Sequence, residues 1–374
     1  MSAMKVGLVG CGMIRRPYLQ ACGESKWLEL AACADLFPER AEEACKEAEE
    51  KGWGNPRPCT LEEILDDPEI GLVMNITNPK AHYPLSLRAL EAGKHVYVEK
   101  PLCVTREEGE AMLAAAKKHN VLLGCAPDTF LGKGHQTARA LIDSGAIGEP
   151  TAVSFCFSGP GPDGYHQDPE PGFEAGGGPM FDVGVYVLTH VVNHLGPVKR
   201  VCGFSKITFP ERKIMSEKKF GQIMKVEIPT HVTASLEFAN GVLGTFVTSF
   251  DIKGDHQLPR IEIYGTEGSL HIGDPNGFHE ASTLFLASDR EKGWHEVEAT
   301  HGYSGKCRGM GGADLVASLA NGRPARASGE LAHHVLDVGL SIYESAETGT
   351  FVDVNSTVDR PSVMPEGVTA DIED

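Results

Sequence analysis

The sequence lacks the features of a secreted, membrane-spanning or nucleic-acid-binding protein. It contains no run of about 20 apolar residues, the length that a membrane-spanning helix requires. Its 34 lysines and arginines are outnumbered by 52 aspartates and glutamates, and the net charge of −18 argues against nucleic acid or an anionic membrane as a partner. The first residues also lack the charged, apolar and small-residue regions of a signal peptide. We therefore expect a cytoplasmic protein.

Cysteine and histidine are present, but not in metal-binding or redox motifs. The ten cysteines include no C-x-x-C pair, and we expect them to be reduced thiols in the core. The histidines of HVVNH, His190 and His194, have the spacing of a zinc-binding helix. Val191 stands where the H-E-x-x-H motif has its catalytic glutamate. We therefore predict core or rim histidines and no metal site.

The first distinctive stretch joins an apolar run to a glycine turn. The run from Met4 ends at Gly10-Cys11-Gly12, and a segment that can be helical follows. Glycines let the backbone approach a pyrophosphate, and the N-terminus of the next helix stabilises its charge. Arg15 stands in place of the third glycine of G-x-G-x-x-G. The pattern predicts a dinucleotide site, with an ordinary strand–helix turn as the alternative.

Asp35 follows the second predicted strand, Leu28 to Ala34. An acid at this point of a dinucleotide-binding fold accepts hydrogen bonds from the adenosine ribose and repels a 2′-phosphate, which favours NAD over NADP. Arg40 lies close by in the sequence and weakens that preference, so NADP remains possible. The alternative is that Asp35 caps the helix predicted over Pro38 to Lys51.

Two sequence patterns divide the chain near residue 126. Strands alternate with helices up to Cys125, which predicts parallel βαβ units, whereas from Thr151 strands follow one another. Asn240-Gly241 between two of these strands predicts a hairpin. The predicted fold is α/β: a Rossmann NAD(P)-binding domain over 1–126, then an α+β domain over 127–374 with a large, mainly antiparallel open sheet. We expect the tail after Arg360 to be loose or to lie on a partner subunit.

Glu99-Lys100-Pro101 follows the strand predicted over Lys94 to Val98. Ligands bind parallel sheets at the carboxyl ends of the strands, so Lys100 is expected beside a ligand. Partial burial would lower its pKa, and Glu99 would hold its position, so that Lys100 could take a proton from a substrate hydroxyl. The alternative is a surface lysine in an ordinary loop.

A second candidate group follows Gly176-Gly177-Gly178, where three glycines would let the backbone pass close to a ligand. A helix is predicted to begin there, with Asp182 and Tyr186 on one face at positions i and i+4. Together they could bind and deprotonate a polyol. The loop from Gly159 to Phe173 is rich in proline and suits a cover over the substrate, with Tyr165 and His166 able to stack on or hydrogen-bond a sugar; a plain surface loop is the alternative.

Taken together, these motifs resemble the Gfo/Idh/MocA family of sugar and inositol oxidoreductases. The resemblance covers nearly the whole chain and rests on the segments VGLVGCG, TNPKAH, AGKHVYVEKP, GGGPMFD-x-G and ASGELAHHVLDVGLSIYESAETG. It implies a Rossmann domain followed by an α/β domain whose open sheet often makes subunit contacts. We therefore expect a homodimer or homotetramer.

The resemblance also implies roles for single residues. Lys100 would be the catalytic lysine, and Asp182 would orient the substrate hydroxyl. The family's histidine, four positions after Asp182, is Tyr186 here, so the acid/base role falls to Tyr186 or Lys100, with His190 or His166 helping. The cofactor, NAD or NADP, would lie against Gly10, Cys11, Gly12, Met13, Ile14, Asp35, Thr77, Asn78, His82, Glu99, Lys100 and Asp128.

The function that we predict is dehydrogenation of a secondary hydroxyl of a sugar, glycoside or cyclitol by a nicotinamide cofactor. GCAPDTFLG and GGGPMFD resemble a subgroup that oxidises glucosides, often at C3, and would place Asp128 near the nicotinamide or the sugar. One alternative is an enzyme that cleaves glycosides through a 3-keto intermediate and recycles NAD. The other is a non-catalytic regulator that senses a sugar or nucleotide.

Overall fold

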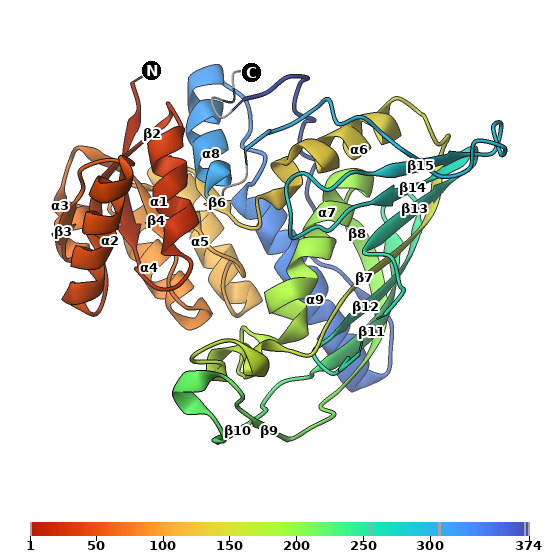
Figure 1. Cartoon of the computed structure of the whole chain (residues 1–374), viewed down its shortest axis with the longest axis horizontal. Coiled ribbons are helices and arrows are strands. Elements are labelled where there is room, and N and C mark those ends of the chain that lie inside the picture. The colour runs from red at the N-terminus through yellow and green to blue at the C-terminus, as the bar shows by residue number, and fades with distance from the viewer. Residues whose placement is uncertain (1, 255, 306–307, 370–371, 373–374) are drawn as a thin grey trace. The chain divides into compact units, whose positions relative to one another are not determined.

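The computed structural model describes residues 2–254, 256–305, 308–369 and 372. The chain forms two compact units (Figure 1). The first comprises Met1–Lys133, His301–His333 and Pro361–Asp374, and the second comprises Gly134–Thr300 and His334–Arg360. The predicted boundary between residues 126 and 127 stays a prediction. It did not include the later segments that return to the first unit.

The first unit contains a parallel sheet, as predicted. Its six described strands lie in the order β3-β2-β1-β4-β5-β6, and each described pair is parallel. The chain order reverses at β1, which lies between β2 and β4. Ligands of such sheets bind at this switch point. The strands are β1 (Met4–Val9), β2 (Leu28–Ala34), β3 (Arg57–Cys59), β4 (Ile70–Asn75), β5 (His95–Val98) and β6 (Leu123–Cys125).

These strands form because their apolar runs are buried by helices, which is typical of parallel sheets. Val6, Leu72 and Val96 on three neighbouring strands are each 0% exposed. A capping box at Thr60 starts the short helix that follows it, since Glu63 N donates to Thr60 Oγ1 over 3.2 Å and Glu63 Oε2 accepts from Thr60 N over 2.7 Å. The helices are α1 (Arg15–Glu24), α2 (Pro38–Lys51), α3 (Leu61–Asp66), α4 (Pro79–Glu91), α5 (Arg106–His119) and α8 (Met310–Asn321).

Helix α8 and the segment after it complete this sheet from far along the chain. A Cβ on Gly124 of β6 would lie 2.8 Å from Leu315 Cδ1 and 2.9 Å from Ala327 O. Cys125 N donates to Ala327 O over 3.0 Å. The sequence analysis did not predict α8, although the parallel sheet depends on it for part of its cover.

The second unit contains a mixed sheet of nine described strands in the order β16-β15-β14-β13-β7-β12-β11-β8-β17. Among these described strands, β7 and β12 are parallel and the other pairs are antiparallel, so the predicted mainly antiparallel sheet is confirmed. The strands are β7 (Pro150–Ser158), β8 (Val198–Lys206), β11 (His231–Phe238), β12 (Leu243–Ser249), β13 (Ile261–Gly265), β14 (Gly268–Ile272), β15 (Thr283–Leu286), β16 (His295–Glu296) and β17 (Val352–Asp353).

Helices cover one face of this sheet (Figure 1). They are α6 (Lys133–Asp143), α7 (Val185–Leu195) and α9 (Gly329–Thr348), and α9 begins in the first unit. A separate two-stranded hairpin is formed by β9 (Glu211–Lys213) and β10 (Ile223–Lys225). Short 3₁₀ turns span Thr129–Leu131, Pro162–Gly164, Glu170–Phe173 and Glu217–Lys219.

Two expectations for this part of the chain have opposite outcomes. The hairpin at Asn240-Gly241 is confirmed: it joins β11 to β12, with Gly241 at φ +88°. The expectation of a loose tail is wrong for residues 361–369, because Met364 is 0% exposed and Arg326 Nε donates to Ser362 O over 2.9 Å. Buried side chains therefore hold the tail against the first unit.

The nine described cysteines are free thiols, and Cys307 lies outside the described residues. None of the helices in the described part of the chain combines the length and apolar character of a membrane-spanning helix. The same residues contain no group of three or more histidine, cysteine, aspartate or glutamate side chains arranged to hold a metal ion.

Candidate active site

The glycine turn lies at the switch point, directly after β1. Gly10 has φ +93°, and a Cβ on it would lie 2.8 Å from Thr77 Cγ2 and 3.0 Å from Thr77 N. The turn therefore packs closely against the loop after β4. A Cβ on Gly12, in contrast, would have no atom within 4 Å. The space beside Gly12 is open, as the approach of a pyrophosphate requires.

The beginning of α1 also fits a phosphate. Its N-cap, Ile14, makes no side-chain capping bond, so the N-cap side chain does not occupy the first amide groups of α1. Arg15 Nε donates to Glu47 Oε2 over 2.9 Å, and its Nη1 donates to Cys11 O over 3.1 Å. The Arg15 side chain therefore links the glycine turn to α2. Met13 beside it is 69% exposed, as a residue on a cofactor surface would be.

Asp35 braces the same turn from the end of β2. Its carboxylate accepts from Cys11 N over 2.6 Å and from Phe37 N over 2.9 Å. The N-cap of α2 is Phe37, with no side-chain capping bond, so the alternative that Asp35 caps this helix is wrong. Arg40 lies over the Phe37 ring at 4.6 Å. The contacts of Phe37 with Asp35 and Arg40 were not predicted from the sequence. An apolar residue just after the strand-end acid was a usable signal for them.

The loop after β4 is ordered by Asn75, which the sequence analysis also missed. Asn75 is 0% exposed, donates to Ser86 Oγ over 3.0 Å and accepts from Thr77 Oγ1 over 2.7 Å. Thr77 is half-buried and Asn78 is exposed, so both border the switch point. A buried asparagine at a strand end signals such a network, because its amide must find partners.

His82 links this loop to the one after β5. Its ring is 0% exposed, with Nδ1 2.7 Å from Pro101 O and Nε2 3.1 Å from Thr77 O. Burial lowers the pKa of His82, so the ring is neutral and donates to one of these carbonyls. The structure thus gives His82 a supporting position beneath the predicted cofactor residues.

Glu99 and Lys100 directly follow β5, as predicted. Glu99 is 6% exposed and accepts from Tyr18 Oη over 2.7 Å and from the backbone N of Lys100 over 2.8 Å. Burial, then the Glu99 charge, raises the pKa of Tyr18 well above its usual value, so this phenol stays protonated as a donor. Glu99 therefore holds Lys100 through its main chain, and Lys100 itself is half-buried.

Asp128, after β6, anchors α8. It is 0% exposed, and Oδ2 accepts from Gly309 N over 2.7 Å and from Gly311 N over 2.9 Å. Burial raises the pKa of Asp128 in spite of these bonds. The carboxyl thus joins β6 to the start of α8, a structural role that its sequence position did not reveal.

In the second unit, the predicted regular helix at Asp182 and Tyr186 is partly wrong. Met180–Gly184 forms a single π-helical turn, and α7 begins only at Val185. Asp182 is half-buried, whereas Tyr186 is 6% exposed. Single π turns in helices frequently mark functional sites, because they redirect a side chain.

The glycines before this turn pack against the protein. A Cβ on Gly177 would lie 2.4 Å from Pro171 O, and one on Gly178 would lie 2.3 Å from Ile228 Cδ1. Gly177 and Gly178 thus let segments of the second unit pack closely against each other. The prediction was that these glycines let the backbone pass close to a ligand.

The histidines of α7 lie in the core. His190 and His194 are both 0% exposed, and His135 of α6 meets His190 edge-on with ring centroids 4.3 Å apart. Burial lowers the pKa of all three, that of His135 to about 4. His190 Nδ1 lies 2.7 Å from Tyr186 O, so His190 supports the backbone of Tyr186. The prediction of core histidines is confirmed.

His166 lies in the long loop between β7 and the π turn. Its ring is half-buried, Nδ1 accepts from Asp168 N over 3.1 Å, and its own N donates to Pro162 O over 2.9 Å. His166, Asp182 and Tyr186 belong to the second unit, and Lys100 with the predicted cofactor residues belongs to the first.

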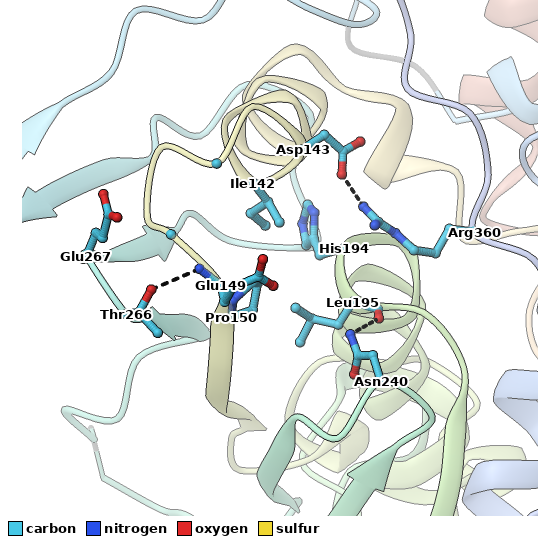
Figure 2. A pocket seen from close by; sticks show the side chains of 12 residues that line it. Ile142, Asp143, Glu149, Pro150, His194, Leu195, Asn240, Thr266, Glu267 and Arg360 are labelled. Carbon is cyan, nitrogen blue, oxygen red and sulfur yellow. Dashed lines mark hydrogen bonds and ion pairs between the residues drawn. The ribbon is translucent and has the colours of Figure 1, made fainter.

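A pocket of about 480 Å³ lies elsewhere in the second unit (Figure 2). It is found at the C-terminal end of α7, where His194 and Leu195 line it beside the ion pair of Asp143 and Arg360. Tyr186 lies at the other end of α7, about 12 Å away at 1.5 Å per residue. None of the predicted catalytic residues lines this pocket.

Comparisons with known proteins agree with this geometry. Residues 4–126 match a family model described as an oxidoreductase family with an NAD-binding Rossmann fold, and residues 135–271 match the GFO/IDH/MocA C-terminal domain. Levoglucosan dehydrogenase of Pseudarthrobacter phenanthrenivorans is 26% identical, with 95% of this chain and 99% of the relative covered. D-glucoside 3-dehydrogenase of Escherichia coli (strain K12) is 26% identical over 94% of this chain and 98% of the relative.

Solved structures show the same fold. Apo levoglucosan dehydrogenase has a TM-score of 0.81 at 23% identity, with 96% of this chain and 100% of that one covered. Its complex with NADH and levoglucosan has a TM-score of 0.79 at 24% identity over 95% and 100% of the two chains. The parallel sheet of the first unit and the mixed sheet of the second unit thus both have counterparts in these structures. The two family-model matches show that this chain belongs to the Gfo/Idh/MocA family of NAD-binding oxidoreductases.

Proposed function

We propose that this protein is an NAD-dependent dehydrogenase of a sugar, glycoside or cyclitol, and that C3 of a glucoside is the position oxidised. The observation that carries the proposal is the open space at Gly12 on the same sheet edge as Lys100. Relatives named as levoglucosan, D-glucoside 3- and scyllo-inositol 2-dehydrogenases support the substrate class.

The cofactor residues follow from the first unit. Gly10 N and Cys11 N donate to Ala34 O and Asp35 Oδ2, so the backbone amides from Gly12 to the start of α1 would hold the pyrophosphate. Asp35 would accept from the adenosine ribose, which favours NAD over NADP. Met13, Ile14, Thr77 and Asn78 would border the cofactor, while His82, Glu99 and Asp128 would hold the loops that form its site. NAD, when bound there, accepts a hydride.

The reaction removes a hydride from the carbon and a proton from the oxygen of one secondary alcohol, giving a ketone. Lys100 would take the hydroxyl proton, with Tyr186 or His166 assisting. Asp182 would accept hydrogen bonds from the ring hydroxyls and so hold the carbon in place. The buried His190 would act on Tyr186 through the backbone carbonyl that it contacts. Positioning supplies much of the rate in such a reaction.

We also propose that the protein is a cytoplasmic homodimer or homotetramer. The free thiols of the described cysteines suit a reducing compartment. Phe204 on β8 and Leu243 on β12 are 74% and 61% exposed, and a subunit contact would bury them. Light scattering of the purified protein would give the oligomeric state.

The direct test supplies NAD or NADP with glucosides, free hexoses and inositols and follows reduced nicotinamide by absorbance. We expect steady NADH formation with at least one glucoside, and a 3-keto product by NMR. An aglycone released without net NADH would instead indicate the cleaving enzyme. Binding of a sugar or of NAD, with no NADH formed from any of the sugars, would indicate the non-catalytic regulator.

A further inference from the structure

Residues 209–227, which we call the hairpin segment, had no predicted role. They contain β9 and β10, and they pack against residues 159–173, which we call the long loop (Figure 1). Backbone bonds join the two: Met215 N donates to Asp163 O over 2.9 Å, and Glu227 N donates to Phe173 O over 3.0 Å. The long loop is thus bonded to a second segment that begins about 40 residues later in the chain.

A small apolar core lies between the two segments. It consists of Phe173 from the long loop, Ile214, Met224 and Val226 from the hairpin segment, and Phe250, each at most 7% exposed. The rings of Phe173 and Phe250 meet edge-on at 5.7 Å. This core makes the long loop part of a packed substructure of the second unit.

Arg212 stands at the centre of this substructure. Its side chain is 3% exposed, and its Nη1 donates to Asp163 Oδ1 over 2.6 Å and to Pro160 O over 2.9 Å. Its Nη2 donates to Asp251 Oδ1 over 2.7 Å and to Phe250 O over 2.6 Å. The planar fork of an arginine can join several acceptors in this way, which a lysine cannot do.

The sequence of the long loop accommodates this guanidinium. Gly161 has φ +91°, and a Cβ on it would lie 2.6 Å from Arg212 Nη1 and 2.9 Å from Asp163 Oδ1. A side chain at position 161 would therefore displace the arginine as well as strain the backbone. Lys218 bonds Asp168 at 2.7 Å in an exposed pair, and Lys219 bonds Glu170 at 2.7 Å in a part-buried pair; both pairs are more exposed than Arg212 and therefore weaker.

We propose that Arg212 is a positioning residue that fixes the long loop, and with it His166, in the conformation that contacts the sugar. This inference rests on the function proposed above. His166 lies three residues after Asp163, and its N donates to Pro162 O, so the anchor at Asp163 sets the backbone from which His166 projects. Arg212 itself is buried away from solvent and acts through the loop.

The expected signature is a change in sugar binding with the chemical step intact. Lys100, Tyr186 and Asp182, the proposed proton-accepting, assisting and orienting groups, are outside the long loop and the hairpin segment. With Tyr186 as the assisting group, His166 contributes to sugar binding alone. Loss of Arg212 should therefore raise KM for the sugar at least about tenfold while kcat changes less than about threefold. The affinity for NAD, measured by nicotinamide fluorescence, should stay the same.

The test compares Arg212→Ala, Arg212→Lys and Asp163→Asn with the wild type. Arg200→Ala is the matched control, because Arg200 pairs with Glu237 on the exposed surface of β8 and β11. Arg212→Lys keeps the charge but loses the fork, so its KM should fall between those of the wild type and Arg212→Ala. Asp163→Asn should raise KM in the same direction, and it serves if Arg212→Ala fails to fold.

Limited chymotrypsin digestion tests the loop without any need for activity. Tyr165 at the tip of the long loop is 67% exposed. Cleavage after Tyr165 should be at least about tenfold faster in folded Arg212→Ala than in the wild type or Arg200→Ala, because protease reaches an opened loop more often.

Unchanged KM and unchanged cleavage in the folded variants would overturn the proposal. So would an equal fall in kcat and kcat/KM at constant KM, since that pattern belongs to a group acting only in the transition state. If none of the sugars tested supports NAD reduction by the wild type while Arg212→Ala still opens the loop, the proposed function fails. The anchoring of the loop by Arg212 then still stands.

Discussion

The two glycine-rich turns of this protein look alike in sequence but do different things. In the first unit, a Cβ on Gly12 would meet no atom within 4 Å, so the turn borders open space. In the second unit, a Cβ on Gly177 would lie 2.4 Å from Pro171 O, so the protein itself fills that space. The first turn leaves room for a ligand, whereas the second permits two backbone segments to pack.

The difference reflects what surrounds each turn. Gly12 follows a strand and precedes a helix, and both are regular elements whose ends meet at the switch point of a parallel sheet. Gly177 lies between the long loop and the π turn, where the backbone of residues 171–174 packs against it and its N donates to Glu174 O. Regular strands and helices thus position the turn at Gly12, whereas packing between irregular segments positions the turn at Gly177.

Lys100→Ala should have the largest effect, because it changes the proposed site at the edge of the parallel sheet. We expect turnover to fall about a thousandfold, because the proposed proton acceptor is lost from the end of β5. NAD should still bind with nearly unchanged affinity, since Glu99 holds this loop through the backbone N of residue 100. Lys118→Ala, on the exposed surface of α5, is the control for steady-state kinetics. Full activity of Lys100→Ala would rule out the mechanism.

Acid should lower the stability of the second unit through its buried histidines. His135 binds a proton near pH 6.5 when unfolded but near pH 4 when folded, because burial lowers its pKa to about 4. Its contribution to stability is complete above pH 6.5 and is lost as the pH falls, by about 3 kcal/mol at pH 4. Urea unfolding between pH 7 and pH 4 should show a shallower dependence on pH for His135→Gln. An identical slope in both proteins would contradict this account.

Gly177→Ala should unfold the protein more easily without acting on the cofactor. The new methyl group would overlap Pro171 O, and overpacking of this kind costs about 2 kcal/mol. The midpoint of urea unfolding should fall, while the NAD affinity of the folded protein stays the same. Weaker NAD binding with normal stability would place a ligand at Gly177 and remove the contrast between the two turns.

Gly12→Ala should have the smallest and opposite effect. Its methyl group meets no protein atom, so stability should change by less than about 0.5 kcal/mol. It would occupy the space proposed for the pyrophosphate, and the Kd for NAD should rise about tenfold. Calorimetric titration with NAD measures this, and an unchanged Kd would mean that the diphosphate does not lie beside Gly12.

Much of the first unit could be predicted because its signals are local. The bounds of β2 and α2, the capping box at Thr60 and the strand ends at Gly10 and Lys100 follow from periodicity and turn residues. The packing of α8 against β5 and β6 could not be predicted in the same way. It depends on a contact between Asp128 and Gly309, which 181 positions separate.

The second unit was predicted less completely for the same physical reason. Strand β11 and the turn at Asn240-Gly241 follow from alternation and turn chemistry, and both were predicted. The π turn at Asp182 has no local signature, because an extra residue in a helical turn is stabilised by tertiary contacts. The role of Arg212 was equally hidden, since its partners come from the long loop and from the end of β12.

The return of residues 301–333 and 361–374 to the first unit has a practical consequence. A gene fragment that stops just after Asp128 would encode the six described strands of the parallel sheet but leave Gly124 and Asp128 without α8. Exchange of nucleotide-binding halves between members of this family by a single crossover would meet the same difficulty. Working chimaeras would have to carry all three pieces of the first unit together.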